Sequence, residues 1–166
     1  MNLNRLFITF FGTGLAPKAP GTVGSFAALV VGVALLQVIP MQTLFMLTFA
    51  ITIIGIFEIN KYEKATGSHD DKSIVIDEVA GMWIALMFAI ATAETLTYAY
   101  AYEIAIVGSF AAFRLFDIWK PSIIGVIDRK IKGGLGVMGD DIIAGIAGGL
   151  LTIVLLLGLD KILFLI

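Results

Sequence analysis

The chain has 166 residues, of which 59% are hydrophobic and 14% are charged. Soluble domains average roughly 45–50% apolar and about 25% charged residues, so this composition predicts a protein that lies in a membrane. The net charge of −2 gives no electrostatic case for binding nucleic acid. Because the chain has no cysteine, disulfide bonds, thiolate metal sites and catalysis by a cysteine nucleophile are excluded.

Five apolar segments are long enough to be membrane-spanning helices, which need about 20 mostly apolar residues. They are residues 23–39, 41–57, 74–91, 95–116 and 142–159. Residues 6–11 are too short to cross, and we expect an interfacial or re-entrant piece there, or the start of a soluble-facing helix. The sequence therefore predicts an all-α, polytopic integral membrane bundle of about five transmembrane helices, forming one domain over residues 1–166.

The lysines and arginines predict the orientation, because cytoplasmic loops carry an excess of both. With a cytoplasmic N-terminus, five spans place residues 1–22, 58–73 and 117–141 on the cytoplasmic side. Every lysine and arginine except Lys161 then lies in those segments or, like Arg114, at the inner end of a span. Four spans would leave one basic cluster on the other side. We therefore expect the three segments to meet at the cytoplasmic face.

The first segment is Phe11-Gly-Thr-Gly-Leu-Ala-Pro-Lys-Ala-Pro-Gly-Thr-Val-Gly-Ser25, which runs directly into an apolar helix. Glycine lets the backbone approach a ligand, and N–H groups at the start of a helix attract anions. The candidate substrate-binding residues here are Gly12, Thr13, Gly14, Lys18 and Thr22. The alternative is an ordinary loop in which Thr22 or Ser25 caps the helix. The GK[ST] ending of a Walker A loop is absent.

The second segment places Asp77 and Glu78 within the start of the third span. A carboxylate at the bilayer centre costs about 2.5–3.5 kcal/mol on insertion scales, so such residues usually face partners or a polar cavity. Adjacent acids point about 100° apart on a helix, so one could hold a metal while the other supports it or reaches a second metal. The alternative is that both reach interfacial water. We expect His69, Asp70 and Asp71 to be exposed loop residues.

The third segment begins with Arg114 and Asp117, which are three residues apart and could pair on one helix face. Lys120 and Pro121 are expected to end that helix. The segment closes with Asp140 and Asp141 at the start of the last span.

These two aspartates are candidate metal ligands, and the alternative is that they only cap the last helix. A run of glycines from residue 133 to 139 is expected to make the preceding loop pliable. Gly145, Gly148 and Gly149 are expected to pack the last span against its neighbours.

The three segments together combine pairs of acids, basic residues and a glycine-rich loop. Mg²⁺ takes oxygen ligands, often one or two carboxylates plus a substrate phosphate. Metal and basic groups would neutralise a phosphate and stabilise the charge that develops during its transfer. The residues therefore predict a metal-dependent phosphoryl-transfer site acting on a membrane-embedded or lipid substrate.

Two alternatives belong to other functional classes. A small ion or solute transporter is one, because acids within the membrane and glycine-broken helices also occur there. Such a transporter would need its acids near the bilayer midplane, whereas these cluster at one end of the spans. The other is a lipid phosphotransferase, for which we find no second-substrate site.

Three stretches resemble the phosphatidylglycerophosphatase A family: FGTGLAPKAPGTVGS, IVIDEVAGMW and FRLFDIWKPSIIGVIDRKIKGGLGVMGDDIIAG. They occur in the family's order, and the last is long enough to be specific. The resemblance implies an enzyme of the bacterial inner membrane, and the topology predicted above makes it multi-pass with its active site facing the cytoplasm. Such an enzyme uses Mg²⁺ to hydrolyse the phospholipid phosphatidylglycerol phosphate to phosphatidylglycerol and phosphate, which completes phosphatidylglycerol synthesis.

With this resemblance, the hypothesis for the site assigns two sets of residues. The metal ligands and catalytic residues are Asp77, Glu78, Asp140 and Asp141, one of them a candidate general base. The substrate-binding set adds Arg114, Lys120 and Lys132 to the first segment, with Asp117 orienting Arg114. Direct attack by water is favoured because a metal lowers the pKa of bound water. A phospho-aspartate intermediate is the alternative.

Overall fold

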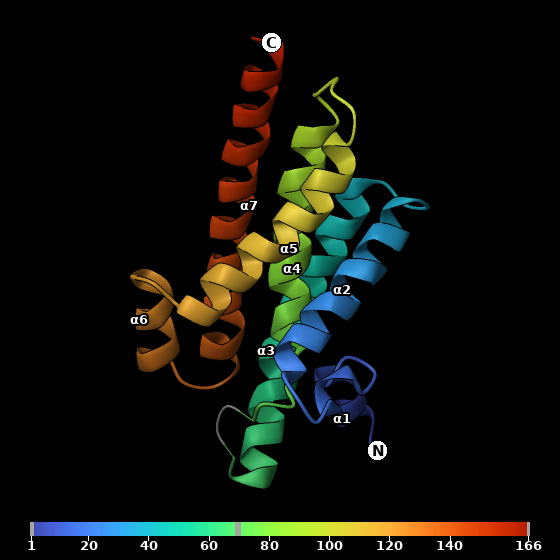
Figure 1. Cartoon of the computed structure of the whole chain (residues 1–166). Helices are drawn as coiled ribbons and strands as arrows, with labels where there is room; N and C mark the ends of the chain where they lie inside the picture. Colours follow the sequence, from blue (N-terminus) through green and yellow to red (C-terminus); the bar gives the residue numbers. More distant parts are fainter. Residues whose placement is uncertain (1, 69–70, 166) are drawn as a thin grey trace.

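The computed structural model describes residues 2–68 and 71–165, and every regular element within these ranges is helical (Figure 1). In chain order these are α1 (Leu3–Ile8), the 3-10 helix η1 (Thr13–Leu15), α2 (Pro20–Leu36), α3 (Met41–Thr66), α4 (Ile76–Ala93), α5 (Ala101–Trp119), α6 (Ile123–Lys130) and α7 (Gly134–Phe164). The all-α prediction is confirmed for this part of the chain. His69 and Asp70, expected in an exposed loop, lie outside the described residues.

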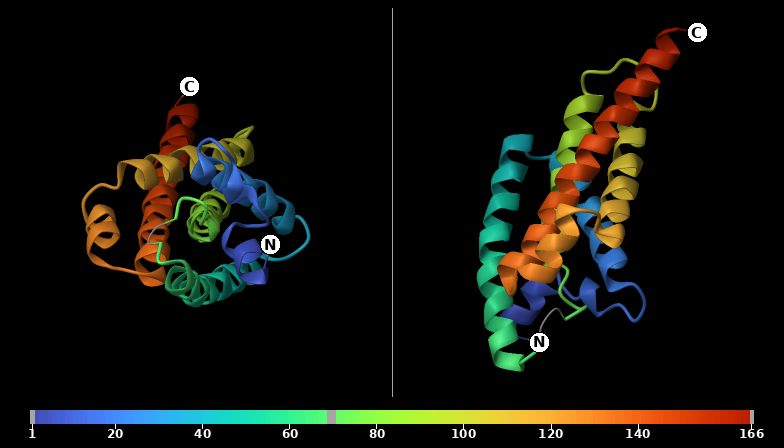
Figure 2. Two further views of the ribbon diagram at one scale, coloured as in Figure 1. Left: turned by 90° about the horizontal axis from the view of Figure 1, so that it is seen from below. Right: turned by 90° about the vertical axis from the view of Figure 1, so that its left-hand side faces the viewer.

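By length and composition, three of the described helices can cross a membrane. They are Met41–Thr66, Ile76–Ala93 and Gly134–Leu163. α2 is apolar but has only 17 residues, and α5 carries Glu103, Arg114 and Asp117 among its 19 residues. The prediction of a helical membrane protein is thus supported, with three such helices rather than five. In the right-hand view of Figure 2, α3, α4, α5 and α7 run lengthwise beside one another.

The last helix begins earlier than predicted, at Gly134 rather than Ile142. The expectation of a pliable glycine-rich loop is wrong, because its glycines from residue 134 onward lie within α7. A Cβ added at Gly134 would lie 2.3 Å from the Ile56 carbonyl oxygen, and one at Gly136 would lie 2.0 Å from that of Ile131. These glycines therefore allow close packing of the first turns of α7.

Two further boundaries differ from the prediction. α3 continues past Phe57 to Thr66, so it projects beyond the other long helices at the lower end of Figure 1. Residues 95–100, expected to be helical, lie in the connection between α4 and α5, and Tyr100, the N-cap of α5, adopts a left-handed conformation with φ of 67°. A bulky residue with left-handed φ and ψ angles interrupts a right-handed helix.

α4 is the central helix of the bundle, and the left-hand view of Figure 2 shows the other long helices arranged around it. Most of its side chains are buried. Its contact with α7 is very close, because a Cβ added at Gly145 would lie 2.3 Å from the Gly81 carbonyl oxygen. A Cβ at Gly148 would lie 2.7 Å from the Phe113 backbone nitrogen on α5. The predicted packing role of these glycines is therefore confirmed.

The N-terminal residues support the chain just before α4. The Val75 N–H donates a hydrogen bond of 2.9 Å to the Ile8 carbonyl at the end of α1. Gly14 in η1 lies against the same connection, and a Cβ there would be 2.1 Å from the Ser73 carbonyl oxygen. Gly24 on α2 contacts Val75 from another side. This packing fixes where α4 begins, and hence where its first two acidic side chains point.

Replacing Gly145 by alanine is expected to destabilise the bundle, because the added methyl carbon would collide with the Gly81 carbonyl. Overpacking of this kind typically costs about 1–3 kcal/mol. Gly158→Ala in the same helix is the matched control, since no atom lies within 4 Å of its added Cβ. Alanine's better helix propensity should leave that variant unchanged or stabilise it by up to about 1 kcal/mol. Thermal unfolding in detergent compares the two, and equal Tm values would contradict the packing described.

Candidate active site

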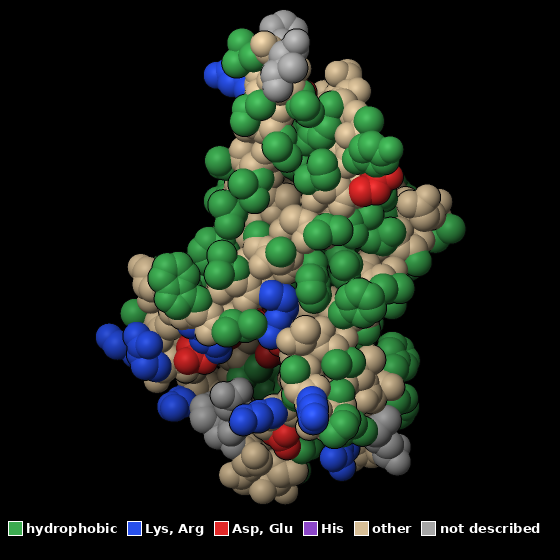
Figure 3. All heavy atoms as spheres, viewed as in Figure 1, with side chains coloured by type: hydrophobic (Ala, Val, Ile, Leu, Met, Phe, Trp, Pro, Cys, Tyr) green, Lys and Arg blue, Asp and Glu red, His purple; other side chains and the backbone are tan. Residues whose placement is uncertain are grey.

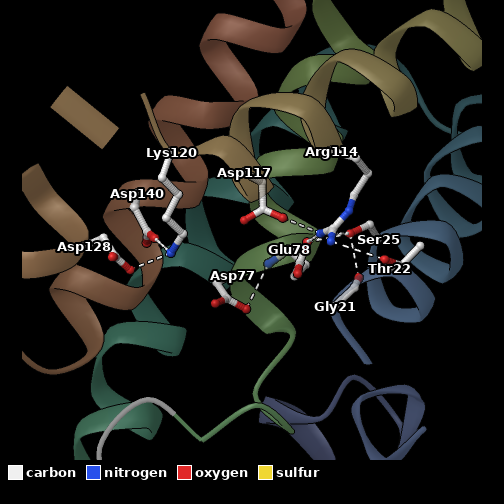
Figure 4. Close-up of polar contacts among 10 residues, drawn as sticks. All are labelled: Gly21, Thr22, Ser25, Asp77, Glu78, Arg114, Asp117, Lys120, Asp128 and Asp140. Carbon is white, nitrogen blue, oxygen red and sulfur yellow. Dashed lines mark hydrogen bonds and ion pairs between the residues drawn. The ribbon is translucent and has the colours of Figure 1, made fainter. Parts of the chain in front are cut away.

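A cavity of about 270 Å³ lies where the ends of five helices meet, namely α2, α4, α5, α6 and α7. Acidic side chains from α4, α5, α6, α7 and the connection before α4 line it: Asp71, Asp77, Glu78, Asp117, Asp128, Asp140 and Asp141. Lys72 and Lys120 also line the cavity. The three separated segments of the sequence therefore do meet at one place. Figure 4 shows the central residues of this site.

One cluster of contacts centres on Arg114 of α5. Its Nη1 lies 2.7 Å from Oε2 of Glu78 on α4, and it also forms an ion pair with Asp117 (Figure 4). The predicted pairing of Arg114 with Asp117 is confirmed. Arg114 further donates to the hydroxyl oxygens of Ser25 at 3.1 Å and Thr22 at 3.3 Å on α2. The arginine thus joins three helices at the edge of the cavity.

The start of α2 is adapted to this cluster. α2 begins at Pro20, so the alternative that Thr22 or Ser25 caps it is wrong. The Ser25 hydroxyl instead lies 2.5 Å from Glu78 Oε2. A Cβ at Gly21 would lie 2.2 Å from Glu78 Oε1, so only glycine lets α2 come this close to the carboxylate.

A second cluster centres on Lys120, the residue that ends α5. Its Nζ lies 2.5 Å from Asp128 of α6 and 2.6 Å from Asp140 of α7. Burial alone would lower the pKa of Lys120, but the hydrogen bonds and negative charges of the two aspartates raise it above its ordinary value. The ammonium group therefore stays protonated at neutral pH and holds α6 against α7.

Three carboxylates are close enough together to share one cation. One oxygen each of Glu78, Asp117 and Asp141 lies within 4.8 Å of the others, and all three residues are buried. Oδ2 of Asp141 and Oδ1 of Asp140 are buried, and neither has a hydrogen-bond partner among the described residues. Buried carboxylate oxygens without donors are well suited to a hard cation, which would take their lone pairs.

The three carboxylates that lie close together only partly coincide with the predicted metal ligands. The three-carboxylate group contains Glu78 and Asp141, which are among the predicted ligands, and also Asp117, which we expected only to orient Arg114. Asp77 and Asp140 line the same cavity outside this group. The alternative that Asp140 and Asp141 cap α7 is wrong, because Gly133 is its N-cap and both lie in its second turn.

Several residues of the predicted substrate-binding set do not line the cavity. Gly12, Thr13 and Gly14 lie in and beside η1, where Gly14 packs against the chain before α4. Lys18 and Lys132 are exposed outside the cavity. The part of the glycine-rich segment that precedes α2 therefore lies outside the cavity, whereas Pro20 and Gly21 of the same segment line it.

Other residues of the site escaped the sequence analysis. Asp128 lies four residues after buried Ile124 on α6, a spacing that places both on one helix face. Asp71, expected to be exposed, is partly buried and accepts hydrogen bonds from Tyr62 Oη at 2.8 Å and Ser73 N–H at 2.9 Å. The Ser73 hydrogen bond is the main reason that the pKa of Asp71 is lowered.

The fold and the cavity define a class: helical membrane proteins with a buried carboxylate site at one end of the bundle. A family model described as phosphatidylglycerophosphatase A matches residues 6–156, a range that includes all the segments described above. The chain belongs to the phosphatidylglycerophosphatase A family. The predicted resemblance is thereby confirmed.

Individual relatives agree with this assignment. A phosphatidylglycerophosphatase A of Escherichia coli is 39% identical over 86% of this chain and 77% of its own length. A phosphatidylglycerophosphatase A of Haemophilus influenzae is 36% identical over 88% of this chain and 84% of its own length. A proposed phosphatidylinositol-3-phosphatase of Bacteroides thetaiotaomicron is 38% identical over 83% of this chain and 84% of its own length. No solved structure matches the chain.

Arg114→Gln is expected to destabilise the protein by about 3–5 kcal/mol, because it leaves Glu78 and Asp117 buried without their cation. Adding Asp117→Asn should restore part of the loss by removing one uncompensated charge. Lys61→Gln is the control, since its 3.6 Å ion pair with Glu58 is largely exposed and worth at most about 1 kcal/mol. Unfolding midpoints in detergent give the comparison. An Arg114 variant as stable as the Lys61 variant would show that Arg114 does not hold the site together.

Proposed function

We propose that this protein is a Mg²⁺-dependent lipid phosphatase that hydrolyses phosphatidylglycerol phosphate to phosphatidylglycerol and phosphate. The observation that carries the proposal is the cavity lined by carboxylates and lysines at one end of a helical membrane bundle. Membership of the phosphatidylglycerophosphatase A family supports the reaction and the substrate. The names of two relatives agree with it.

The charge of the cavity supports a metal ion. Seven carboxylates line it, against two lysines and the neighbouring Arg114. A phosphomonoester carries up to two negative charges and would be repelled by such a cavity without further cations. Glu78, Asp117 and Asp141 fit Mg²⁺ because each offers a buried carboxylate oxygen within the same small volume.

The chain's own residues then have distinct roles in the proposed reaction. Arg114 and Lys120, already fixed by carboxylates, would each turn a remaining donor toward the phosphate. Asp77, outside the three-carboxylate group, is the candidate base. It would take a proton from water as the water oxygen bonds to phosphorus. The phosphorus–oxygen bond to glycerol breaks, and the leaving oxygen gains a proton to become the product's hydroxyl. Bound Mg²⁺ would supply positive charge that stabilises the reacting phosphate.

Lys18 and Lys132 are exposed and would act at longer range by attracting the anionic headgroup. Gly12, Thr13 and Gly14 would contribute only through the position of α4. A phospho-aspartate intermediate is the alternative to direct attack by water, and acid quenching during turnover would trap it.

The distribution of charge supports a multi-pass protein of a bacterial inner membrane with this site on the cytoplasmic face. Lysine and arginine gather on the lower part of the molecule in Figure 3, and hydrophobic side chains cover most of the part above. We propose that α2 and α5 cross together with α3, α4 and α7, although α2 is short and α5 is less apolar. Of the lysines and arginines, Lys161 alone then lies at the opposite face, which agrees with the excess of these residues in cytoplasmic loops.

A transporter is not favoured by where the acids lie. Asp77 and Glu78 are in the first turn of α4, and Asp140 and Asp141 are in the second turn of α7. All of them line one cavity at the end of the bundle, whereas transport sites lie near the bilayer midplane.

The activity is tested with purified protein in mixed micelles of detergent and phosphatidylglycerol phosphate. Phosphate release is expected with Mg²⁺ and should stop with EDTA. Asp77→Asn should lower kcat at least about 100-fold if Asp77 is the base. Phosphatidylinositol 3-phosphate is the comparison substrate, because one relative bears the name of a phosphatase for that lipid. Absence of phosphate release from either lipid would refute the proposed function.

The metal site is tested by thermal unfolding, without any reaction. In EDTA, Asp141→Asn is expected to raise Tm, because it removes one of three neighbouring buried negative charges. Mg²⁺ at about 100 times its Kd should stabilise the wild type by about 2.7 kcal/mol and stabilise this variant much less. Asp160→Asn, at the other end of α7, is the control and should respond to Mg²⁺ as the wild type does. An equal Mg²⁺ response of the Asp141 variant would remove Asp141 from the metal site.

A further inference from the structure

The short helix α6 has two faces of opposite character. Ile124 is buried and Asp128 lines the acidic cavity, so these two define the inward face. Ile123 and Val126 point outward and are exposed. The inward face is explained by the cavity, but nothing in the described part of the chain covers the outward face. Figure 1 shows α6 standing at the side of the bundle, beside the lower end of α7.

The outward surface also changes character along the chain. Its first part is apolar, with Ile123, Val126 and, at the end of α5, Trp119, which is 69% exposed. Its last turn is basic, with Arg129 and Lys130 both exposed. Figure 3 shows the same order at this side of the molecule, with hydrophobic side chains above lysine and arginine. We call Trp119 together with the outward residues of α6 the α6 surface.

This order matches the boundary between the acyl chains and the headgroups of a bilayer. Tryptophan is enriched at that boundary, and basic residues just outside it attract anionic lipids. The acidic cavity on the inward side would by itself repel negatively charged headgroups. Basic side chains on the outward side of the same helix offset this repulsion where a lipid would approach.

We propose that the α6 surface docks on an anionic bilayer face and gathers negatively charged lipid headgroups beside the mouth of the cavity. Trp119 and Ile123 lie among the outer acyl carbons, while Arg129 and Lys130 contact the headgroups. The partner is the bilayer itself, and its recognition requires only negative charge on the lipid. This docking does not depend on the proposed hydrolysis.

The chain carries its own probe for the test. It has two tryptophans, and Trp83 is only 3% exposed, so Trp119 is the one that lipids can reach. The full chain is reconstituted into phosphatidylcholine vesicles that contain either brominated phosphatidylserine or brominated phosphatidylcholine at the same mole fraction. Bromine quenches a neighbouring tryptophan. We expect stronger quenching by the anionic lipid, with enrichment of up to about fivefold for each basic residue.

Variants separate the basic residues from charge in general. In Arg129→Gln/Lys130→Gln, the two brominated lipids should quench equally. Lys61→Gln/Lys64→Gln, which removes two exposed positive charges from α3, should keep the preference for the anionic lipid. Trp119→Phe gives the background from Trp83.

Three results would overturn the proposal. Equal quenching by both lipids in the wild type would show that the α6 surface does not select anionic lipid. A preference retained in the Arg129/Lys130 variant would assign it to other residues. If neither lipid quenches Trp119, the α6 surface lies in water, and a soluble acidic partner would be the better candidate to bind it. Because phosphatidylserine is neither substrate nor product of the proposed reaction, these results are independent of catalysis.

Discussion

The site depends on the ion pairs of Arg114 with Glu78 and Asp117. A buried carboxylate is unstable without a counter-charge, and removing one partner of a buried pair is far more costly than losing a surface pair. Arg114 also reaches Ser25 on α2, so three helices meet at one guanidinium group. Its planar set of donors can serve several acceptors at once, which a lysine ammonium of similar charge could not do with the same geometry. The position of Glu78 in the cavity therefore follows from this arginine.

Close helix packing sets the remaining geometry. Gly81 lies one turn after Glu78, and a Cβ there would be 2.5 Å from the Asp141 carbonyl oxygen. The contact between α4 and α7 thus fixes how far apart the carboxylates of Glu78 and Asp141 lie. Small residues allow this approach in membrane bundles, where tight packing replaces much of the hydrophobic driving force. Gly21 does the same on the α2 side. In this protein, helix packing and site geometry rest on the same glycines.

Relations within one helix were predictable from the sequence, and relations between helices were predictable only in outline. The spacing of Arg114 and Asp117 predicted their pairing because both lie on one helix face. The bias of lysine and arginine brought the three segments to one face, but it could not say which side chains meet. Asp117 was assigned only to Arg114, since its approach to Asp141 depends on the crossing of α5 and α7.

Glycine also misled the sequence analysis at two places, because it serves both loops and close helix contacts. The run before Asp140 suggested a loop, yet it forms the start of α7. Gly14 suggested an anion-binding loop, yet it makes room for the Ser73 carbonyl. A single sequence does not distinguish these uses, because the deciding atom belongs to a distant segment.

The charge of the cavity links metal and substrate in the proposed function. With seven carboxylates against Lys72, Lys120 and Arg114, the cavity disfavours a phosphate until a cation is bound. A phosphate would in turn strengthen the binding of that cation by adding oxygen ligands and negative charge. Thermodynamic linkage requires the two effects to be equal in free energy. Under the proposed function, each ligand would therefore bind more tightly once the other is bound, which would let a carboxylate-rich cavity take an anionic substrate.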